Sequence, residues 1–145
     1  MNTGKTGIGR FFKGFVYAFE GVISCIKTER NMRFHIGAAL IVILLMRFYE
    51  LSAAETAAVY ICIGLVISLE LVNTAVEAAV DMMCKDKNAF AKKAKDCAAG
   101  AVLVAAIVSV AVGIKIFWDY SAFAAIASYF AERIWLCVVL AAGVI

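Results

Sequence analysis

The sequence predicts an all-α membrane protein: an N-terminal amphipathic helix, three transmembrane helices and an apolar C-terminal segment that could form a fourth helix. Of the 145 residues, 65% are hydrophobic and only 17% are charged, and the mean hydropathy is +0.94. A soluble domain usually contains about a quarter charged residues. The chain also lacks proline, which favours uninterrupted helices. Its net charge of +3 is too small to indicate a nucleic-acid partner.

The first expected element is an amphipathic helix over residues 10–27. Its polar residues, which include Arg10, Lys13 and Lys27, lie mostly away from one apolar face. Such a helix with a basic polar side is suited to lying in a membrane interface. The apolar face is formed by Phe12, Phe15, Phe19, Val22, Ile23 and Ile26.

Three candidate spans follow, at about 34–51, 53–83 and 97–117. Each is near or above the ~20 residues that cross a bilayer at ~1.5 Å per residue. The second is longer than a bilayer needs, so one of its ends should project into water. Residues 1–118 form the predicted membrane domain. Residues 119–145 form an apolar extension of unassigned role, which could be a fourth span or two interfacial segments.

The distribution of lysine and arginine predicts the orientation. Six of them precede residue 36 and five lie in the 84–96 loop, whereas the opposite side receives only Arg47 and Lys115, with Arg133 unassigned. We therefore expect a multi-pass protein of the cell membrane with the N-terminus and the 84–96 loop in the cytoplasm. This orientation places the C-terminal end of the second span on the side that contains ATP.

That end of the second span carries an unusual polar stripe. At 100° per residue, positions 70, 73, 77 and 81 fall within about 80° of one another. Ionisable groups in membrane helices are costly and usually face a protein interior or a wet cavity. The stripe could also be a solvated helix end or a set of polar contacts between helices. Its members are Glu70, Asn73, Glu77 and Asp81.

The chemistry of the stripe suggests phosphoryl transfer. Mg²⁺ is typically bound by one or two carboxylates together with nucleotide phosphates, and a further carboxylate could serve as general base for a hydroxyl. The following segment, CKDKNAFAKKAKDCAAG, adds five lysines that could bind phosphates. Acids for a metal, cations for phosphates and a membrane location together predict transfer of a phosphoryl group to a lipid.

The run ELVNTAVEAAVD at 70–81 resembles the signature of the small integral-membrane diacylglycerol kinases of bacteria. The resemblance covers roughly residues 8–118 without an evident gap. The segments TERNMRFH and SLELVNTAVE are more similar to the Gram-positive branch, whose members favour undecaprenol over diacylglycerol. Matching residues outside the run are Arg10, Lys13, Tyr17, Gly21, Glu29 and Ala94-Lys95-Asp96.

The resemblance implies a homotrimer with active sites shared between subunits, which transfers the γ-phosphate of ATP to a lipid hydroxyl. By matched position, Glu70 would be the general base, and Glu29 and Glu77 would hold Mg²⁺. Asn73 would help to order the metal and phosphates. The expected nucleotide contacts are Arg10, Tyr17, Lys95 and Asp96, with Asp86, Lys87 and Asn88 in a loop that matches in position but not in residue type.

Other interpretations of single residues remain open. Lys95 could be a positive-inside anchor, Lys13 could bind anionic headgroups, and Tyr17 could belong to an aromatic belt. Asp81 could be structural, and His35 could be an interfacial polar residue. At the level of function, the preferred prediction is an undecaprenol kinase. Its alternatives are a diacylglycerol kinase, and a non-enzymatic oligomeric scaffold or transporter subunit.

Overall fold

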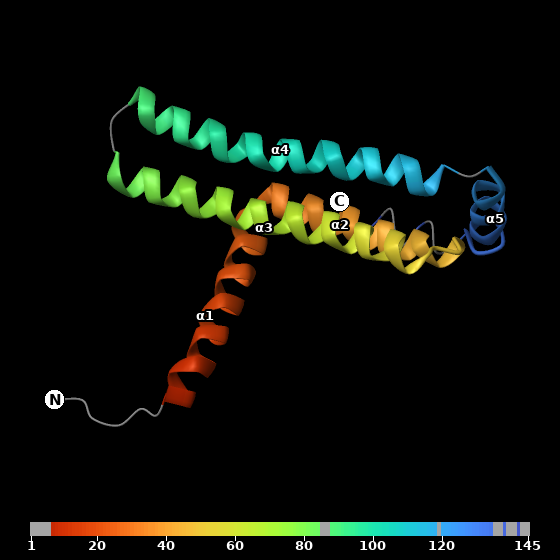
Figure 1. Cartoon of the computed structure of the whole chain (residues 1–145), viewed down its shortest axis with the longest axis horizontal. Helices are drawn as coiled ribbons and strands as arrows, with labels where there is room; N and C mark the ends of the chain where they lie inside the picture. Colours follow the sequence, from red (N-terminus) through yellow and green to blue (C-terminus); the bar gives the residue numbers. More distant parts are fainter. Residues whose placement is uncertain (1–6, 85–87, 119, 135–137, 139–141, 143–145) are drawn as a thin grey trace.

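The computed structural model describes residues 7–84, 88–118, 120–134, 138 and 142, and every regular element in this part of the chain is helical (Figure 1). This confirms the predicted fold class. Helices α2, α3 and α4 are each long and apolar enough to cross a membrane. The elements in chain order are α1 (Gly7–Thr28), α2 (Arg30–Leu45), the 3₁₀ turn η1 (Met46–Phe48), α3 (Ala53–Met83), α4 (Ala89–Phe117) and α5 (Tyr120–Ala131).

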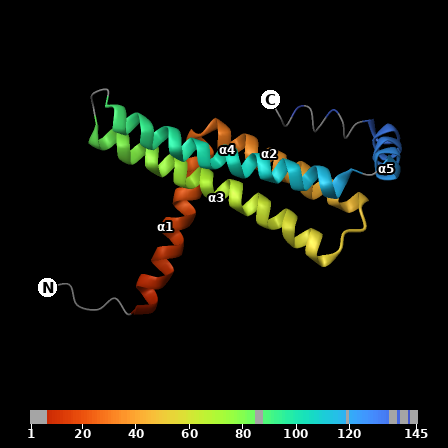
Figure 2. The same ribbon diagram turned by 45° about the horizontal axis from the view of Figure 1, so that its top comes forward.

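Helices α3 and α4 form a long antiparallel hairpin that is the main body of the molecule, and α2 packs along part of it (Figures 1 and 2). Local sequence fixes where both helices begin. Ser52 and Glu55 form a capping box, in which each side chain bonds the other residue's backbone N–H. The Asn88 side chain accepts hydrogen bonds from the N–H groups of Phe90 and Ala91 at the start of α4.

The helices that contain two of the predicted spans have other bounds than the spans themselves. The Asn88 cap starts α4 eight residues before position 97, so the charged residues Lys92, Lys93, Lys95 and Asp96 are helical. The helix at the predicted span 34–51 begins at Arg30, ends as an α-helix at Leu45 and continues only as η1. The chain must turn there, because Tyr49 is extended and Ser52 already caps α3.

Helix α1 projects away from the hairpin and joins it at the start of α2 (Figures 1 and 2). The joint is Glu29, whose extended backbone separates the two helices. Beyond this joint, the last turns of α3 and the first turns of α4 continue without α2 beside them (Figure 1). With 31 residues, α3 is about 46 Å long at ~1.5 Å per residue, more than the ~30 Å of hydrocarbon.

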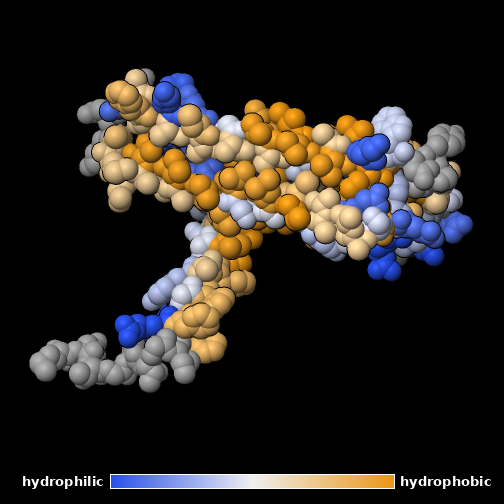
Figure 3. Space-filling view, in the orientation of Figure 1, coloured by the Kyte–Doolittle hydropathy of each residue, from blue (hydrophilic) through white to orange (hydrophobic). Residues whose placement is uncertain are grey.

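The surface is that of a membrane protein. Hydrophobic side chains cover much of the middle of the bundle, and most hydrophilic residues gather toward its two ends (Figure 3). Large apolar residues such as Leu40, Ile61 and Ile107 are more than half exposed. In water this exposure would be unfavourable, whereas lipid or another subunit covers such surfaces in a membrane.

Candidate functional site

The polar stripe lies on the face of α3 that turns toward the other helices. Glu70 is only 2% exposed and Asn73 is 7% exposed, while Glu77 is half-buried. The remaining buried residues of α3 are valines, Val59 and Val66. Buried carboxylates are normally paired or bound to a metal. Within the described part of the chain, however, Glu70 makes no ion pair.

Asn73 and Glu77 form a polar pair one helical turn apart. Nδ2 of Asn73 donates a hydrogen bond of 3.1 Å to Oε1 of Glu77. The other end of the amide, Oδ1 of Asn73, is buried and has no hydrogen-bond partner among the described residues. Such an acceptor costs about 1–3 kcal/mol if nothing pairs with it. The pair therefore presents oxygen atoms that are free to accept a ligand.

A second contact connects this face of α3 to the surface helix. The Thr74 hydroxyl lies 3.0 Å from the carbonyl oxygen of Glu70, to which it donates, and 3.2 Å from Sγ of buried Cys25 in α1. The C-terminal end of α1 is thus in contact with the turn of α3 that carries Glu70. Neither Cys25 nor Thr74 was among the residues predicted from the sequence.

Glu29 lies at the joint between α1 and α2, where Oε1 accepts a hydrogen bond of 3.0 Å from the Thr28 hydroxyl. Arg33, one turn into α2, donates from Nη1 to the carbonyls of Ile26 and Lys27, at 3.1 Å each. These carbonyls belong to the last turn of α1, where helical acceptors lack intrahelical partners. Arg33 therefore closes the end of α1 and fixes the joint at Glu29.

The joint brings several titratable groups near Glu70. Glu29 lies one turn beyond Cys25, whose carbonyl accepts from the Glu29 N–H, and Cys25 contacts Thr74, one turn beyond Glu70. The end of α1 therefore brings the carboxylate of Glu29 to the part of α3 that carries Glu70 and Glu77, and His35 of α2 lines the same cavity as Val66, one turn before Glu70. Among the described residues, no cluster of three or more His, Cys, Asp or Glu side chains is tight enough to hold a metal by itself.

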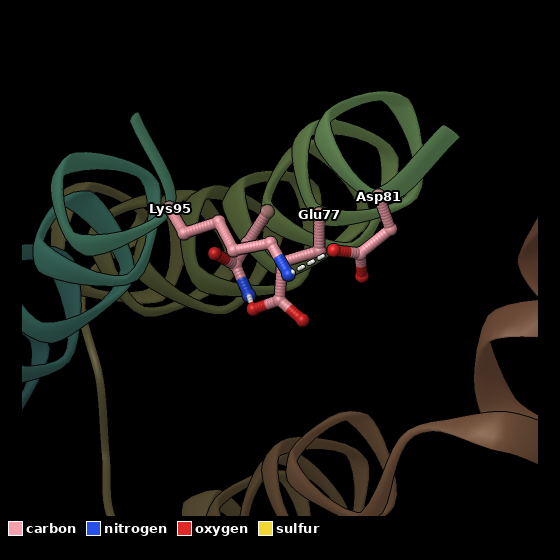
Figure 4. A network of polar contacts seen from close by, with 4 residues as sticks. Glu77, Asp81 and Lys95 are labelled. Carbon is pink, nitrogen blue, oxygen red and sulfur yellow. Dashed lines mark hydrogen bonds and ion pairs between the residues drawn. The ribbon is translucent and has the colours of Figure 1, made fainter. Parts of the chain in front are cut away.

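Beyond the joint, a lysine of α4 reaches across to α3. Nζ of Lys95 lies 2.5 Å from Oδ1 of Asp81, and its side chain extends toward the face that carries Glu77 (Figure 4). Asp81 is exposed because α2 does not cover this end of α3. Asp96 accepts a hydrogen bond of 2.6 Å from Lys92, one turn away. Both predicted nucleotide contacts of α4 therefore have charged partners within the chain.

The other predicted nucleotide contacts lie apart from this face. Arg10 and Tyr17 are exposed on the part of α1 that projects from the bundle. Asn88 caps α4, and Asp86 and Lys87 lie outside the described residues. A single chain thus places Glu29, Glu70, Asn73 and Glu77 in one region. It does not bring Arg10 and Tyr17 of α1 to that region.

An apolar cavity of about 280 Å³ lies between α2, α3 and α4. One end is lined by Phe34 and His35, and its lining continues along the spans to Phe117. Because the lining also includes Val66, one turn before Glu70 on α3, the cavity begins beside the polar stripe. Ser109, another polar residue of the lining, already donates to the carbonyl of Ala105. The rest of the described lining is almost entirely apolar, as a hydrocarbon chain requires.

Residues 16–117 match the family described as prokaryotic diacylglycerol kinase, which is more than half of the chain. The chain belongs to this family. Membership confirms the resemblance inferred from the sequence and the class of enzyme, a membrane lipid kinase that uses ATP. The matched residues include the whole polar stripe, Glu29, Lys95 and Asp96, and they end where α4 ends.

Three relatives illustrate the range of the family. The chain is 44% identical over 113 residues to an undecaprenol kinase of Bacillus subtilis. The aligned residues cover 78% of this chain and 92% of that protein. It is 44% identical over 100 residues to a diacylglycerol kinase of Synechocystis, covering 68% of this chain and 57% of the relative. Identity to the diacylglycerol kinase of Escherichia coli K12 is 27% over 120 residues, covering 83% and 98%.

Sequence reasoning missed four residues that shape the site: Cys25, Arg33, His35 as part of the cavity lining, and Thr74. Thr74 offered one signal, because it stands inside the recognised run. Arg33 was counted only as a positive charge near a membrane end. Its contact with α1 depends on the angle between two helices, which no local pattern contains.

Proposed function

We propose that this chain transfers the γ-phosphate of ATP to undecaprenol, giving undecaprenyl phosphate. The observation that carries the proposal is Glu70, a buried carboxylate on a membrane-spanning helix, beside the Asn73–Glu77 pair and one turn from Val66, which lines an apolar cavity. The choice of undecaprenol is supported by the name of the Bacillus subtilis relative. The alternative acceptor is diacylglycerol, after which other relatives are named.

Glu70 is proposed as the general base. A base must lie within hydrogen-bond reach of the hydroxyl whose proton it takes. A lipid whose chain occupies the cavity would place its hydroxyl near His35 and Val66, on the side where Glu70 lies. Because Glu70 makes no ion pair within the described part of the chain, its carboxylate is available to accept that proton.

Glu77 and Glu29 are proposed to hold Mg²⁺, with Asn73 beside them. The residues fit the ion, because Mg²⁺ prefers oxygen ligands and needs only one or two carboxylates when phosphates complete its shell. The unpartnered Oδ1 of Asn73 supports this assignment, since an ordered group in the active enzyme would satisfy it. When bound, the ion would neutralise charge on the transferring phosphate. The chain's own part is to keep these oxygens on one face of α3.

The nucleotide site is proposed to be completed by a second subunit of a homotrimer. In one chain, Arg10 and Tyr17 lie on the projecting part of α1, away from the stripe. An adjacent subunit could supply them in a symmetric assembly, whose interfaces would repeat around the axis. Lys95 and Asp96 would then contribute from the same chain as Glu77, with the 84–96 loop in the cytoplasm.

The proposal is tested by offering undecaprenol and diacylglycerol side by side, with labelled ATP, to the purified full chain in mixed micelles. We expect undecaprenol to be labelled with the higher kcat/KM, whether or not diacylglycerol is labelled as well. Preference for diacylglycerol would overturn the assignment of the lipid but not of the chemistry. Labelling of neither lipid by a folded, membrane-inserted protein would instead favour the scaffold or transporter subunit.

A further inference from the structure

Helix α5 crosses the end of the bundle rather than continuing along it. In Figures 1 and 2 it lies at a steep angle to the spans, at the end opposite the α3–α4 loop. Its attachment is to η1: the rings of Phe48 and Tyr129 meet edge to face with centroids 5.1 Å apart. The rings of Trp118 and Phe123 make a second contact, at 6.4 Å, across the connection from α4.

The helix is too short to cross a membrane. Its 12 residues extend about 18 Å at ~1.5 Å per residue, whereas the hydrocarbon core is ~30 Å thick. It nevertheless has no charged residue and exposes apolar side chains, among them Phe123 and the alanines at 124, 125, 127 and 131. Water is a poor solvent for such a surface, so an apolar medium must cover it.

The surroundings of α5 are those of a membrane boundary. The adjoining span ends at Phe117, and the next residue, Trp118, is 78% exposed. Tryptophan and tyrosine are enriched where hydrocarbon meets headgroups. At the other end of α5, the Arg133 guanidinium lies 4.4 Å from the centroid of the Tyr129 ring and 3.6 Å from Glu132. Charged groups thus begin where the apolar helix stops.

We propose that α5 is an interfacial helix that lies in the plane of the bilayer, with lipid as its partner. Its exposed side chains would enter the boundary between headgroups and acyl chains, continuous with the lipid-facing surface of the spans. Through Phe48 and Tyr129 it would hold the α2–α3 turn at that level, beside the hydrogen bond of 2.9 Å from the Tyr49 hydroxyl to the carbonyl of Phe117. This role is independent of catalysis, and α5 lies beyond the residues that match the family.

The test measures the depth of single tryptophans in the full chain, in phosphatidylcholine vesicles with bromine at shallow or deep acyl positions. The background carries Trp118→Phe and Trp135→Phe, which removes both native tryptophans. Ala124→Trp and Ala131→Trp then place reporters on one face, about 10 Å apart along the helix. Ile107→Trp, near the middle of the membrane part of α4, is the deep control.

We expect both α5 reporters to be quenched best by shallow bromine, at depths that agree within a few ångströms, while Ile107→Trp is quenched best by deep bromine. Depths that differ by about 10 Å would mean that α5 runs along the membrane normal, which overturns the proposal. Absence of lipid quenching at both positions would also overturn it. Quenching by aqueous iodide would then indicate a helix in water, and no quenching by either would indicate a second protein chain.

A further variant keeps the test valid if the Ala124→Trp or Ala131→Trp protein does not fold. Phe123→Trp exchanges one exposed aromatic ring for another in the same background, so it should leave the packing on η1 intact. Shallow bromine should quench this reporter more strongly than deep bromine. The reverse order, or quenching by iodide alone, would contradict the interfacial location.

Discussion

Nδ2 of Asn73 donates a hydrogen bond of 3.1 Å to Oε1 of Glu77, one turn further along α3. The bond fixes the orientation of the amide and leaves Oδ1 of Asn73 buried and unpartnered among the described residues. A buried acceptor of this kind is costly, so its presence suggests a ligand. This pair is the basis for the proposed metal site.

Glu77→Gln tests that site. The glutamine can keep a hydrogen bond to Asn73, but it removes the negative charge that attracts a divalent cation. We expect kcat to fall by at least about 100-fold, a drop like that from losing one electrostatic stabiliser, and the Mg²⁺ concentration for half-maximal activity to rise. Titration of activity with Mg²⁺ measures both. Glu50→Gln, which changes an exposed acid in the connection between η1 and α3, is the matched control, and an unchanged Mg²⁺ curve in Glu77→Gln would refute the metal assignment.

Lys95 has two possible roles, because it pairs with Asp81 and is also proposed to contact nucleotide. The pair is partly exposed, so its contribution to stability should not exceed about 1 kcal/mol. Asp81→Asn should therefore leave the KM for ATP nearly unchanged, whereas Lys95→Gln should raise it about tenfold or more, in line with losing a charged hydrogen bond.

The exchange of both residues separates the two roles of Lys95. The double variant Asp81→Lys with Lys95→Asp restores an ion pair between α3 and α4 but moves the cation. If Lys95 binds nucleotide, the double variant stays impaired in the KM for ATP. Recovery of the wild-type KM would show that the lysine serves only to join the helices. Steady-state kinetics with varied ATP distinguish these outcomes.

Arg33→Gln should loosen the joint between α1 and α2. It removes two hydrogen bonds to the last carbonyls of α1, each worth about 1 kcal/mol. We expect faster amide hydrogen exchange in the last turn of α1 and lower activity, since Glu29 sits at this joint. Arg30→Gln, which removes an equal charge from an exposed neighbour, should change neither. Equal effects in the two variants would indicate loss of membrane-surface charge instead.

Mixing two inactive chains tests whether sites are shared. Glu70→Gln damages α3 and Arg10→Gln damages α1. If a site combines α3 of one subunit with α1 of its neighbour, equal co-expression should restore about a quarter of wild-type activity, because each defect is independently absent at half of the positions. Activity no higher than that of the separate variants would place both residues of a site in the same chain.

Much of the site could be predicted from the sequence because the helical period is reliable in a long, proline-free segment. Positions 70, 73 and 77 share a face, as expected. The period could not predict that Asp81, on the same face, would be exposed, because this depends on where α2 begins beside α3. The Cys25–Thr74 contact and the packing of Phe48 on Tyr129 join distant segments. Such contacts depend on helix crossing angles and leave no periodic signal.

The most direct test of the central claim is single-turnover phosphorylation of lipid by Glu70→Gln in the full chain. A glutamine has nearly the same shape but cannot take a proton from the hydroxyl. We predict a rate lower by about 10²–10⁴-fold, the usual contribution of a general base, with ATP binding close to that of the wild type. Near-normal turnover in a folded, membrane-inserted Glu70→Gln protein would contradict the role of Glu70 and the site built around it.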